Sequence, residues 1–398
     1  MLNSMKSKNL SDIIEVEKIE IVKKNISEAH GLPNECYTND EYLEYERDHV
    51  FINNWTVIGT ASSVPVSGDT KPFDLIGIPL IIIRDKNQNI RVFHNVCSHR
   101  GHKLVDKQCK QKNLIVCPYH SWSYDFNGEL VRTPHIGGLN HHEVEGFDKR
   151  RSNLKEVRSK VWMDLVFVNI DSCAKDFDVS IKPLEDRWSK FISKDDQKLI
   201  YHAKNFGNFE MSVNSNWKFA IENYCESYHL PSIHPELNRV SNIEDHYHIE
   251  DESMTFSGQG SMKYSQQFDG NKKFSTFPSW PNHLYENSEY VSLFPNLMLG
   301  IHVDHFFAFW LEPLSMTQTK EHFEMYYIGK ESACSDDYKE LREKNFLFWQ
   351  EVMNEDVSAI EGMQNGRKSP VYNGENFSPV MDSSTLLFHK WVAENLTA

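Results

Sequence analysis

The sequence predicts an α+β protein with an N-terminal all-β part, followed by a part that combines strands with long helices. From Trp55 to about residue 170, short runs rich in β-branched and aromatic residues alternate with turn signals. Strand-like runs return over residues 254–328. Residues 336–365 carry apolar side chains at helical spacing, so a long amphipathic helix is expected there. A chain of 398 residues has room for two such domains, each with its own core.

The individual elements follow in chain order. In the N-terminal part short strands are expected within the runs WTVIGTASSV, PLIIIRD, IRVFHNV, LIVCPYHSWSYDFNGEL and VWMDLVFVNI. Asn127-Gly128 predicts a tight turn, because both residues readily adopt a positive φ. A helix is expected over residues 216–229, with Asn216 as its N-cap and Pro231 just beyond its end. The predicted apolar face of the long helix consists of Phe346, Trp349, Val352, Met353, Val357, Ile360 and Met363.

Composition and charge exclude several classes of partner. The chain has 42 Lys and Arg against 57 Asp and Glu, a net charge of −15, which repels nucleic acids and anionic membranes. No run of 18 apolar residues is present, and the N-terminal stretch lacks the apolar segment of a secretory signal. The seven scattered cysteines fit reduced thiols plus a metal site better than a disulfide framework. We therefore expect a cytoplasmic protein.

Two cysteine–histidine pairs form the first candidate metal site. Cys97 and His99 stand in CSH, and Cys117 and His120 stand in CPYH, with 17 residues between His99 and Cys117. Two thiolates and two imidazoles can close a tetrahedral zinc site or hold a Rieske [2Fe–2S] cluster, in which two histidines replace two cysteines on one iron. The ligand count alone leaves both alternatives open.

Two histidines in the segment ENYCESYHLPSIHP form the second candidate site. His229 and His234 are five residues apart with Pro231 between them, so helical spacing does not apply. We expect the first to end a helix and the second to follow a turn, which lets both face one ion. Two histidines and a carboxylate make the facial triad of non-haem Fe(II), with positions left for O₂ and substrate. In isolation, this histidine spacing also fits ordinary structural residues.

The segments around both sites resemble one family. CSHRGH and CPYHSWSYDFNGEL resemble the two ligand loops of Rieske oxygenase domains. NWK…EN-x-x-E-x-Y-H-x4-H resembles the catalytic-iron motif of the Rieske non-haem iron oxygenases, and the resemblance to their alpha (oxygenase) subunits covers nearly the whole chain. It points to the ring-hydroxylating and quaternary-ammonium (betaine, choline, carnitine) oxygenases.

The resemblance implies a role for each site residue. The implied ligands of a [2Fe–2S] cluster are Cys97, His99, Cys117 and His120, and those of a mononuclear Fe(II) are His229, His234 and Asp356. Glu355 and Glu361 are alternatives for the carboxylate and are otherwise solvated charges on the helix face. Glu226 stands where most members have an aspartate that links the two metal sites. In having a glutamate at this position, the sequence resembles the subset of the family that attacks quaternary ammonium compounds.

The resemblance also implies a domain plan and a reaction. Residues 1–45 are expected to form a helical leader packing on the catalytic domain, 46–172 the Rieske domain, and 173–398 a catalytic iron domain of the helix-grip fold. The sequence has no Rossmann fingerprint, so electrons are expected from NAD(P)H through a separate reductase. They would reach the iron through the cluster and Glu226. Activation of O₂ then leads to hydroxylation or oxidative demethylation of a small substrate, in a homotrimer.

The substrate class and two other kinds of protein stay open. Glu226 and the many aromatic residues favour a quaternary ammonium or N-methyl compound, through cation–π contacts. The alternative is an aromatic ring, as in ring-hydroxylating mono- and dioxygenases. Candidate pocket residues are Phe256, Tyr264, Phe306, Phe307 and Trp310. A Rieske ferredoxin without oxygenase activity would need only the first site, and a zinc-stabilised binding protein would need neither iron centre.

Overall fold

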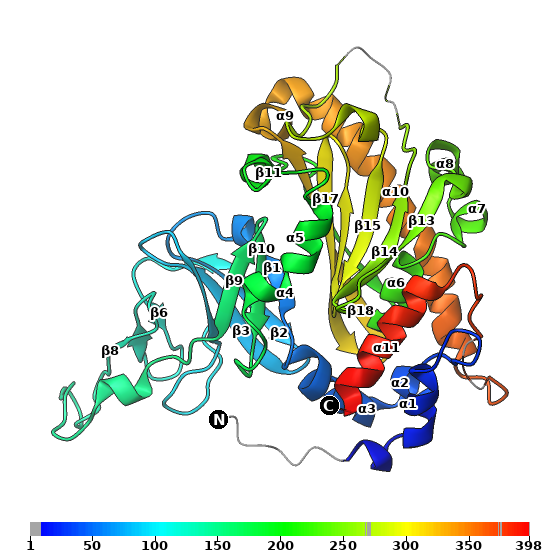
Figure 1. Ribbon diagram of the computed structural model, residues 1–398. Coiled ribbons are helices and arrows are strands. Elements are labelled where there is room, and N and C mark those ends of the chain that lie inside the picture. Colours follow the sequence, from blue (N-terminus) through cyan, green and yellow to red (C-terminus); the bar gives the residue numbers. More distant parts are fainter. Residues whose placement is uncertain (1–8, 267, 269–271, 373, 375, 398) are drawn as a thin grey trace. The chain divides into compact units, whose positions relative to one another are not determined.

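The computed structural model describes residues 9–266, 268, 272–372, 374 and 376–397. The chain divides into two compact units (Figure 1). One unit is Val57–Ala174, and the other combines the segment up to Thr56 with the chain from Lys175 onward. Each unit carries one of the two candidate metal sites.

The unit over residues 57–174 is built from three small sheets. Their strand orders are β1-β10-β9, β4-β3-β2-β5 and β6-β7-β8. The strands are β1 Thr56–Thr60, β2 Asp69–Leu75, β3 Ile78–Arg84, β4 Ile90–His94, β5 Cys109–Lys110, β6 Ile115–Val116, β7 Ser123–Tyr124, β8 Leu130–Arg132, β9 Arg158–Trp162 and β10 Leu165–Asn169. Buried side chains from these strands, among them Ile81, Phe93 and Tyr124, form the core beneath the first candidate site. The expected all-β character of this part is confirmed.

Two of the strand-like runs contain more than one strand. The run from Leu114 to Leu130 contains β6, β7 and the start of β8, and residues 117–122 between β6 and β7 form a loop. The run from Val161 to Ile170 is a hairpin that turns at Met163 and Asp164, whose φ angles are 47° and 72°. The turn at Asn127-Gly128 in the first run is confirmed, whereas the turn at Met163 and Asp164 was not predicted, because it lies within apolar and aromatic sequence.

The second unit contains an eight-stranded antiparallel sheet. Its order is β11-β18-β17-β16-β15-β14-β13, with β12 also paired to β18. The strands are β11 Ile200–His202, β12 Asn208–Val213, β13 His246–Glu250, β14 Phe256–Ser261, β15 Ser288–Leu293, β16 Leu297–Ile301, β17 His305–Ser315 and β18 Gln318–Ile328. The large sheet and the long helix α10 (Lys339–Gly366) together confirm the predicted α+β class.

A row of side chains crosses this sheet on the face that carries the second candidate site. Gln259, Tyr290, Gly300 and Phe307 are direct cross-strand partners on β14, β15, β16 and β17. A Cβ atom at Gly300 would lie 2.2 Å from the Phe307 ring, so the missing side chain makes room for that ring. The Phe307 ring in turn packs on Trp349 of α10, with ring centroids 4.6 Å apart.

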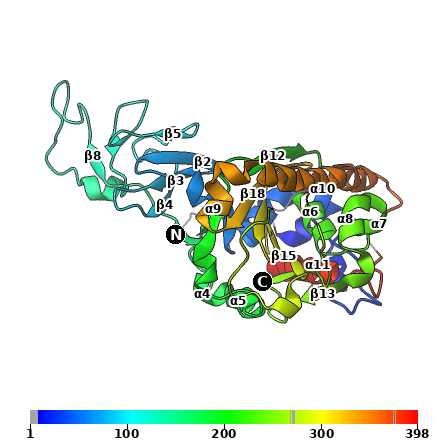
Figure 2. The ribbon, with the colours of Figure 1, turned by 90° about the horizontal axis from the view of Figure 1, so that it is seen from above.

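Helices α6 (Trp217–Tyr224), α10 and α11 (Ser383–Thr397) cover this face of the sheet. The remaining helices are α1 Val16–Val22, α2 Glu35–Thr38, α3 Asp40–Glu46, α4 Phe177–Ser180, α5 Lys182–Trp188, α6 Trp217–Tyr224, α7 Leu230–Ile233, α8 Pro235–Val240, α9 Lys330–Cys334 and α11 Ser383–Thr397. Helix α6 lies between α10 and α11 and contacts both, as the view from above shows (Figure 2). The predicted face of α10 is largely buried, but Met363 is 37% exposed and Val357 only half-buried, so the face ends near Ile360.

Buried polar contacts fix the start of α6. As expected, Asn216 caps the helix, and its side chain accepts a hydrogen bond from the Lys218 N–H at 3.2 Å. Its backbone N–H donates to Gln364 of α10 at 2.8 Å. Lys218 Nζ lies 2.7 Å from Glu46 Oε1, and both side chains are fully buried. These bonds tie α6, which precedes the second site, to α10 and to the N-terminal segment.

None of the helices in the described ranges combines the length and hydropathy needed to cross a membrane.

Candidate metal centres

The two loops that carry Cys97 and Cys117 share one backbone geometry. The Cys97 N–H donates to the His102 carbonyl at 2.8 Å, and the Gly101 N–H donates to the Cys97 carbonyl at 3.0 Å. The second loop makes the same two bonds: the Cys117 N–H donates to the Trp122 carbonyl at 2.8 Å, and the Ser121 N–H donates to the Cys117 carbonyl at 3.0 Å. The fourth position has a positive φ in both loops, 70° at Gly101 and 59° at Ser121. Each loop therefore folds back tightly behind its cysteine.

Each loop buries its thiol and leaves its imidazole nearer to the surface. Cys97 and Cys117 are each 2% exposed, whereas His99 is exposed and His120 half-buried. The His99 ring stacks on Trp122 with centroids 4.6 Å apart, and its centroid lies 4.7 Å from that of His120. Burial raises the pKa of the Cys117 thiol and lowers the pKa of His99. In this environment an uncharged thiol and a neutral imidazole are favoured until a metal binds.

The donor atoms of these loops fit a two-iron cluster better than a single zinc ion. Among the described residues, only His229, His234 and Asp356 bring three ligand atoms within 4.8 Å of one another, so no three of the loop donors do. A tetrahedral zinc ion needs all four donors at about 2.0–2.3 Å from one centre. In a Rieske cluster each iron takes only one pair of ligands. His120 Nδ1 is buried and has no hydrogen-bond partner within the described chain, so its lone pair is available to a metal.

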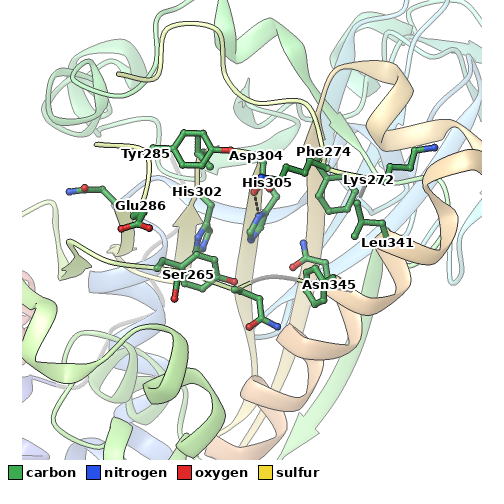
Figure 3. Close-up of a pocket in the computed structure, with 16 residues that line it drawn as sticks. Ser265, Lys272, Phe274, Tyr285, Glu286, His302, Asp304, His305, Leu341 and Asn345 are labelled. Carbon is green, nitrogen blue, oxygen red and sulfur yellow. Dashed lines mark hydrogen bonds and ion pairs between the residues drawn. The ribbon is translucent and has the colours of Figure 1, made fainter. Parts of the chain in front are cut away.

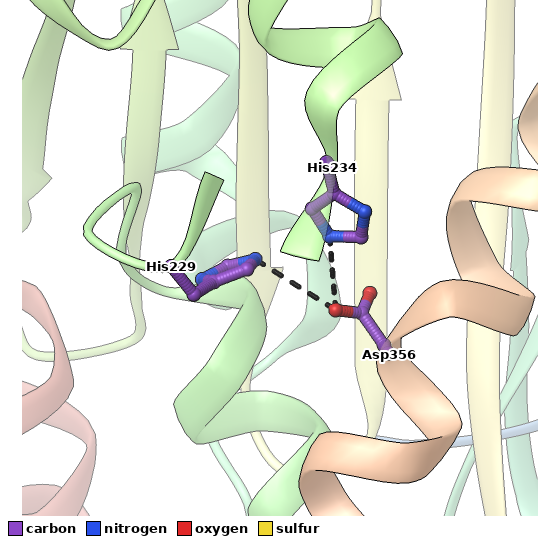
Figure 4. A group of neighbouring side chains, drawn as sticks. All are labelled: His229, His234 and Asp356. Carbon is purple, nitrogen blue, oxygen red and sulfur yellow. Dashed lines mark ion pairs between the residues drawn. The ribbon is translucent and has the colours of Figure 1, made fainter. Parts of the chain in front are cut away.

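The second site brings two histidines and an aspartate together. His229 precedes α7, His234 connects α7 to α8, and Asp356 lies on α10. Asp356 Oδ1 is 2.9 Å from His234 Nε2 and 3.7 Å from His229 Nε2 (Figure 4). The expectation that His229 ends a helix is wrong in detail, because α6 already ends at Tyr224.

A second carboxylate holds the far nitrogen of each histidine. Glu226 Oε1 lies 2.6 Å from His229 Nδ1, and Glu355 Oε2 lies 2.7 Å from His234 Nδ1. Glu226 Oε2 also accepts the backbone N–H groups of Tyr228 and His229. A carboxylate at Nδ1 keeps the proton there and leaves the Nε2 lone pair free to bind a metal.

The arrangement at Asp356 fits a metal rather than a hydrogen bond. Although Oδ1 is 2.9 Å from His234 Nε2, this buried oxygen has no partner with hydrogen-bond geometry in the part of the chain that is described. The three donor atoms therefore converge on one point, as the ligands of one ion do. Burial by itself lowers the pKa of His234, but Asp356 and Glu355 together raise it above its ordinary value. The negative charge that favours a proton on His234 equally favours a divalent cation.

A small pocket of about 40 Å³ adjoins these three residues. Its wall combines the aromatic rings of Tyr224, Tyr290 and Trp349 with apolar side chains such as Leu237 and Met353. The Tyr224 hydroxyl donates to the Leu299 carbonyl at 3.0 Å, which turns its ring rather than its oxygen toward the pocket. In this site the His234 side chain is buried, while those of His229 and Asp356 are 15% and 18% exposed.

Other residues singled out in the sequence lie in different places. Glu361 accepts hydrogen bonds from the backbone and side chain of Asn214 and is not near the two histidines. Tyr228 is 59% exposed, while Cys225 is buried with its Sγ 3.3 Å from Ser257 Oγ. None of the five candidate pocket residues lines the small pocket: Tyr264 lines a larger cavity, and the other four are buried in the sheet.

Sequence reasoning missed two features of the sites. Glu355 was expected only as an alternative ligand, and its contact with His234 depends on α10 packing beside α7. The second feature is Tyr124, whose hydroxyl lies 3.3 Å from Cys97 Sγ and 2.9 Å from Ser98 Oγ. Its position seven residues after Cys117 carries no signal of its own, because the contact depends on how β7 passes the other loop.

Comparisons with known proteins agree with both sites. A family model described as the Rieske [2Fe-2S] domain matches residues 54–143. A second model, described as the ring hydroxylating alpha subunit (catalytic domain), matches residues 200–398, which is half of the chain. The first match contains all four cysteine and histidine candidates, and the second contains His229, His234 and Asp356.

Relatives match over most of their length. The carnitine monooxygenase oxygenase subunit of Acinetobacter pittii is 28% identical over 368 residues, which is 90% of this chain and 91% of that protein. The chloroplastic choline monooxygenase of Spinacia oleracea is 25% identical, over 93% of this chain and 79% of that protein. The quaternary ammonium Rieske monooxygenase CntA, solved with L-carnitine, has the same fold, with a TM-score of 0.74, 23% identity and coverage of 96% and 99%. This chain therefore belongs to the ring-hydroxylating alpha subunits, the catalytic components of the Rieske non-haem iron oxygenases.

Proposed function

We propose that this chain is the oxygenase component of a monooxygenase that hydroxylates or oxidatively demethylates a quaternary ammonium or N-methyl compound. The observation that carries the proposal is the convergence of His229 Nε2, His234 Nε2 and Asp356 Oδ1 beside an aromatic pocket. Within the described chain no lysine or arginine lines that pocket, so no side chain there repels a cation. The rings of Tyr290 and Trp349 offer faces for cation–π contacts. The relatives named for carnitine and choline favour the same substrate class.

In the proposed assignment each metal has its own ligand set. Cys97, His99, Cys117 and His120 hold the [2Fe–2S] cluster, and His229, His234 and Asp356 hold one Fe(II). When bound, these groups supply electron transfer and O₂ activation. The functional domains are proposed as 46–172 for the cluster and 173–398 for the iron, with the leader 1–45 on the latter. Hydrogen bonds of the leader support this placement, such as Tyr45 Oη to the Leu396 carbonyl of α11 at 2.9 Å.

The protein's own residues prepare the iron site. Glu226 and Glu355 hold the proton on Nδ1 of their histidines, so that both Nε2 lone pairs face the ion. The Asp356 carboxylate compensates part of the cation's charge. The aromatic rings of the pocket give it an apolar wall beside the three residues proposed to hold the iron. Glu226 is the proposed link in the electron path from the cluster, because its carboxylate contacts an iron ligand directly.

Electrons are proposed to come from NAD(P)H through a separate reductase and to cross between subunits of a homotrimer. The exposed imidazole of His99 supports this proposal, because it places an edge of the cluster site within reach of another protein. Tyr228 lies two residues after Glu226 and is 59% exposed, so the iron site also has an edge within reach of another protein. The seven unpaired cysteines are typical of a reducing compartment, which supports a cytoplasmic location.

The test is turnover with a generic ferredoxin-type reductase and NADH. Carnitine, choline, betaines and benzoates are supplied in turn, and formaldehyde, trimethylamine and hydroxylated products are measured. Turnover of an ammonium compound with no turnover of benzoates is the expected result. Turnover confined to the benzoates would instead assign ring hydroxylation. Analysis should find about three irons per chain, where an electron carrier would hold about two.

A further inference from the structure

One ring in the wall of the small pocket beside His229, His234 and Asp356 is hydrogen-bonded to a residue outside that pocket. We call this small pocket the iron pocket. Trp349 of α10 lines it, and its indole N–H donates to His305 Nε2 at 3.1 Å. Both side chains are buried. His305 is the first residue of β17, so the bond joins the wall of the iron pocket to the turn between β16 and β17.

A carboxylate on the same turn determines which nitrogen of His305 accepts this bond. His305 Nδ1 lies 2.7 Å from Asp304 Oδ1, and Figure 3 marks the contact with a dashed line. An indole N–H only donates, so His305 Nε2 must accept, and the imidazole proton is on Nδ1, from which it is donated to Asp304. The Asp304 side chain is 31% exposed, whereas that of His305 is 4% exposed. Asp304 therefore favours the one tautomer of His305 that can accept the Trp349 N–H.

Neighbouring rings hold both partners of the bond in place. The His305 ring stacks in parallel on His302, with centroids 4.2 Å apart and an interplanar angle of 7°. Burial, with a smaller contribution from His305, holds the pKa of His302 well below its ordinary value, so this neighbour adds no charge. The Trp349 ring centroid lies 4.6 Å from that of Phe307 and 6.1 Å from that of Tyr290. The indole is thus fixed by packing and by one directional bond.

The direction of the indole N–H matters because an aromatic ring has a negative face and a positive edge. A cation is attracted to the face, whereas an N–H directed at it would repel it. A buried N–H without an acceptor is unfavourable, so the indole would turn toward any acceptor within reach. His305 is not among the described residues that line the iron pocket. The bond therefore directs the N–H of Trp349 to an acceptor outside the wall that a substrate would contact.

We propose that Asp304 and His305 are positioning residues for Trp349 and thereby set the preference of the iron pocket for a cationic over a neutral substrate group. This inference rests on the proposed function and assigns part of its substrate selection to two residues outside the pocket. His305 acts through the indole of Trp349, and Asp304 acts through His305. Trp349 precedes Asp356 by seven residues, which is about two turns of α10, so both lie on one face of the helix.

The test compares two ligands of the same shape that differ in charge. In 3,3-dimethylbutan-1-ol a carbon atom replaces the charged nitrogen of choline, and the rest of the molecule is the same. Calorimetry with the intact wild type should show that choline binds about tenfold or more tightly. His305→Phe keeps a stacked ring but removes the acceptor, and should reduce this preference to less than about threefold. His305→Gln supplies a side-chain oxygen as acceptor and should retain it, as should the exposed control His283→Phe.

Asp304→Asn tests the tautomer separately. The new amide can donate to His305 Nδ1, which moves the imidazole proton to Nε2, where it faces the indole N–H. The choline preference should fall to a value between those of the wild type and His305→Phe. Ultraviolet resonance Raman spectra report the hydrogen bond of the indole directly, and the band of Trp349 is identified by its loss in Trp349→Phe. This band should shift to that of an unbonded indole in His305→Phe and stay that of a bonded indole in His305→Gln.

Each outcome has one meaning. A wild type that binds the two ligands equally, or binds neither, overturns the proposed recognition of ammonium compounds and this inference with it. A wild-type preference that His305→Phe retains overturns the inference alone. So does a loss in His305→Phe that His305→Gln does not restore, because the histidine would then act only through packing. An unchanged preference in Asp304→Asn overturns the role of Asp304. If His305→Phe does not fold, Asp304→Asn decides by the same comparison of ligands.

Discussion

The two candidate metal sites differ in how far apart their ligands lie along the chain. The cysteine–histidine pairs stand on two loops of one small unit, and each loop makes the same pair of backbone hydrogen bonds. The iron site instead joins His229 and His234 to Asp356, more than a hundred residues later on α10. The first site needs only correct local turns, whereas the second exists only when α10 packs beside α7. Loss of metal binding at one site should therefore leave metal binding at the other unchanged.

The largest effects are expected from removing one ligand of each site. Cys97→Ser should abolish the visible [2Fe–2S] spectrum and turnover, because an alcohol is a poor ligand for soft metals. The mononuclear iron should stay, as metal analysis would show. Cys173→Ser changes an exposed cysteine outside the loops and is the matched control. A normal spectrum in Cys97→Ser would remove this residue from the ligand set.

The converse is expected at the iron site. Asp356→Ala should keep the visible spectrum but lose the mononuclear iron and all turnover, because two neutral imidazoles hold Fe(II) weakly. Glu351→Ala removes an exposed carboxylate from the same helix and should bind iron normally. Full iron occupancy with activity in Asp356→Ala would assign the third ligand elsewhere.

Partial recovery is expected when the two defective chains are combined. Cys97→Ser chains keep only the iron, and Asp356→Ala chains keep only the cluster, so each parent is inactive. If electrons cross between subunits, purified mixed oligomers should regain a fraction of wild-type turnover. Activity no higher than that of the parents, or a monomer on a sizing column, would contradict the proposed trimer.

Smaller and different effects are expected from the two carboxylates behind the histidines. Glu355→Gln should weaken iron binding about 10- to 100-fold, because the amide holds His234 less well. Glu226→Gln should retain both metals but slow the oxidation of the cluster in a single turnover, because Glu226 is the proposed link between them. Stopped-flow absorbance of the reduced cluster measures this step, and an unchanged rate in Glu226→Gln would exclude the residue from the path.

The smallest effect is expected at the cap of α6. Asn216→Ala should lower the free energy of unfolding by about 2 kcal/mol, from the lost cap and the unpaired Met316 carbonyl. Asn39→Ala, at the half-buried cap of α3, should cost about 1 kcal/mol. Denaturant titration monitored by far-UV circular dichroism gives both values. The visible spectrum should not change in either variant, since neither residue belongs to the unit that carries the cluster loops.

The sequence by itself determined the α+β class and the family, and it predicted the first ligand set. The cluster loops are recognisable because a cysteine, a histidine and a positive-φ position recur within six residues, where local geometry follows from local sequence. The cap at Asn216 was predictable for the same reason. The turn at Met163 and Asp164 was not, because it lies within strand-like sequence.

Only the tertiary structure decided which carboxylate faces the histidines and what supports them. Asp356 and Glu355 are adjacent on α10, yet one oxygen of Asp356 faces both Nε2 atoms while Glu355 bonds the far side of His234. Helical periodicity places neighbouring residues about 100° apart, but the packing of α10 against α7 decides which direction is the metal site.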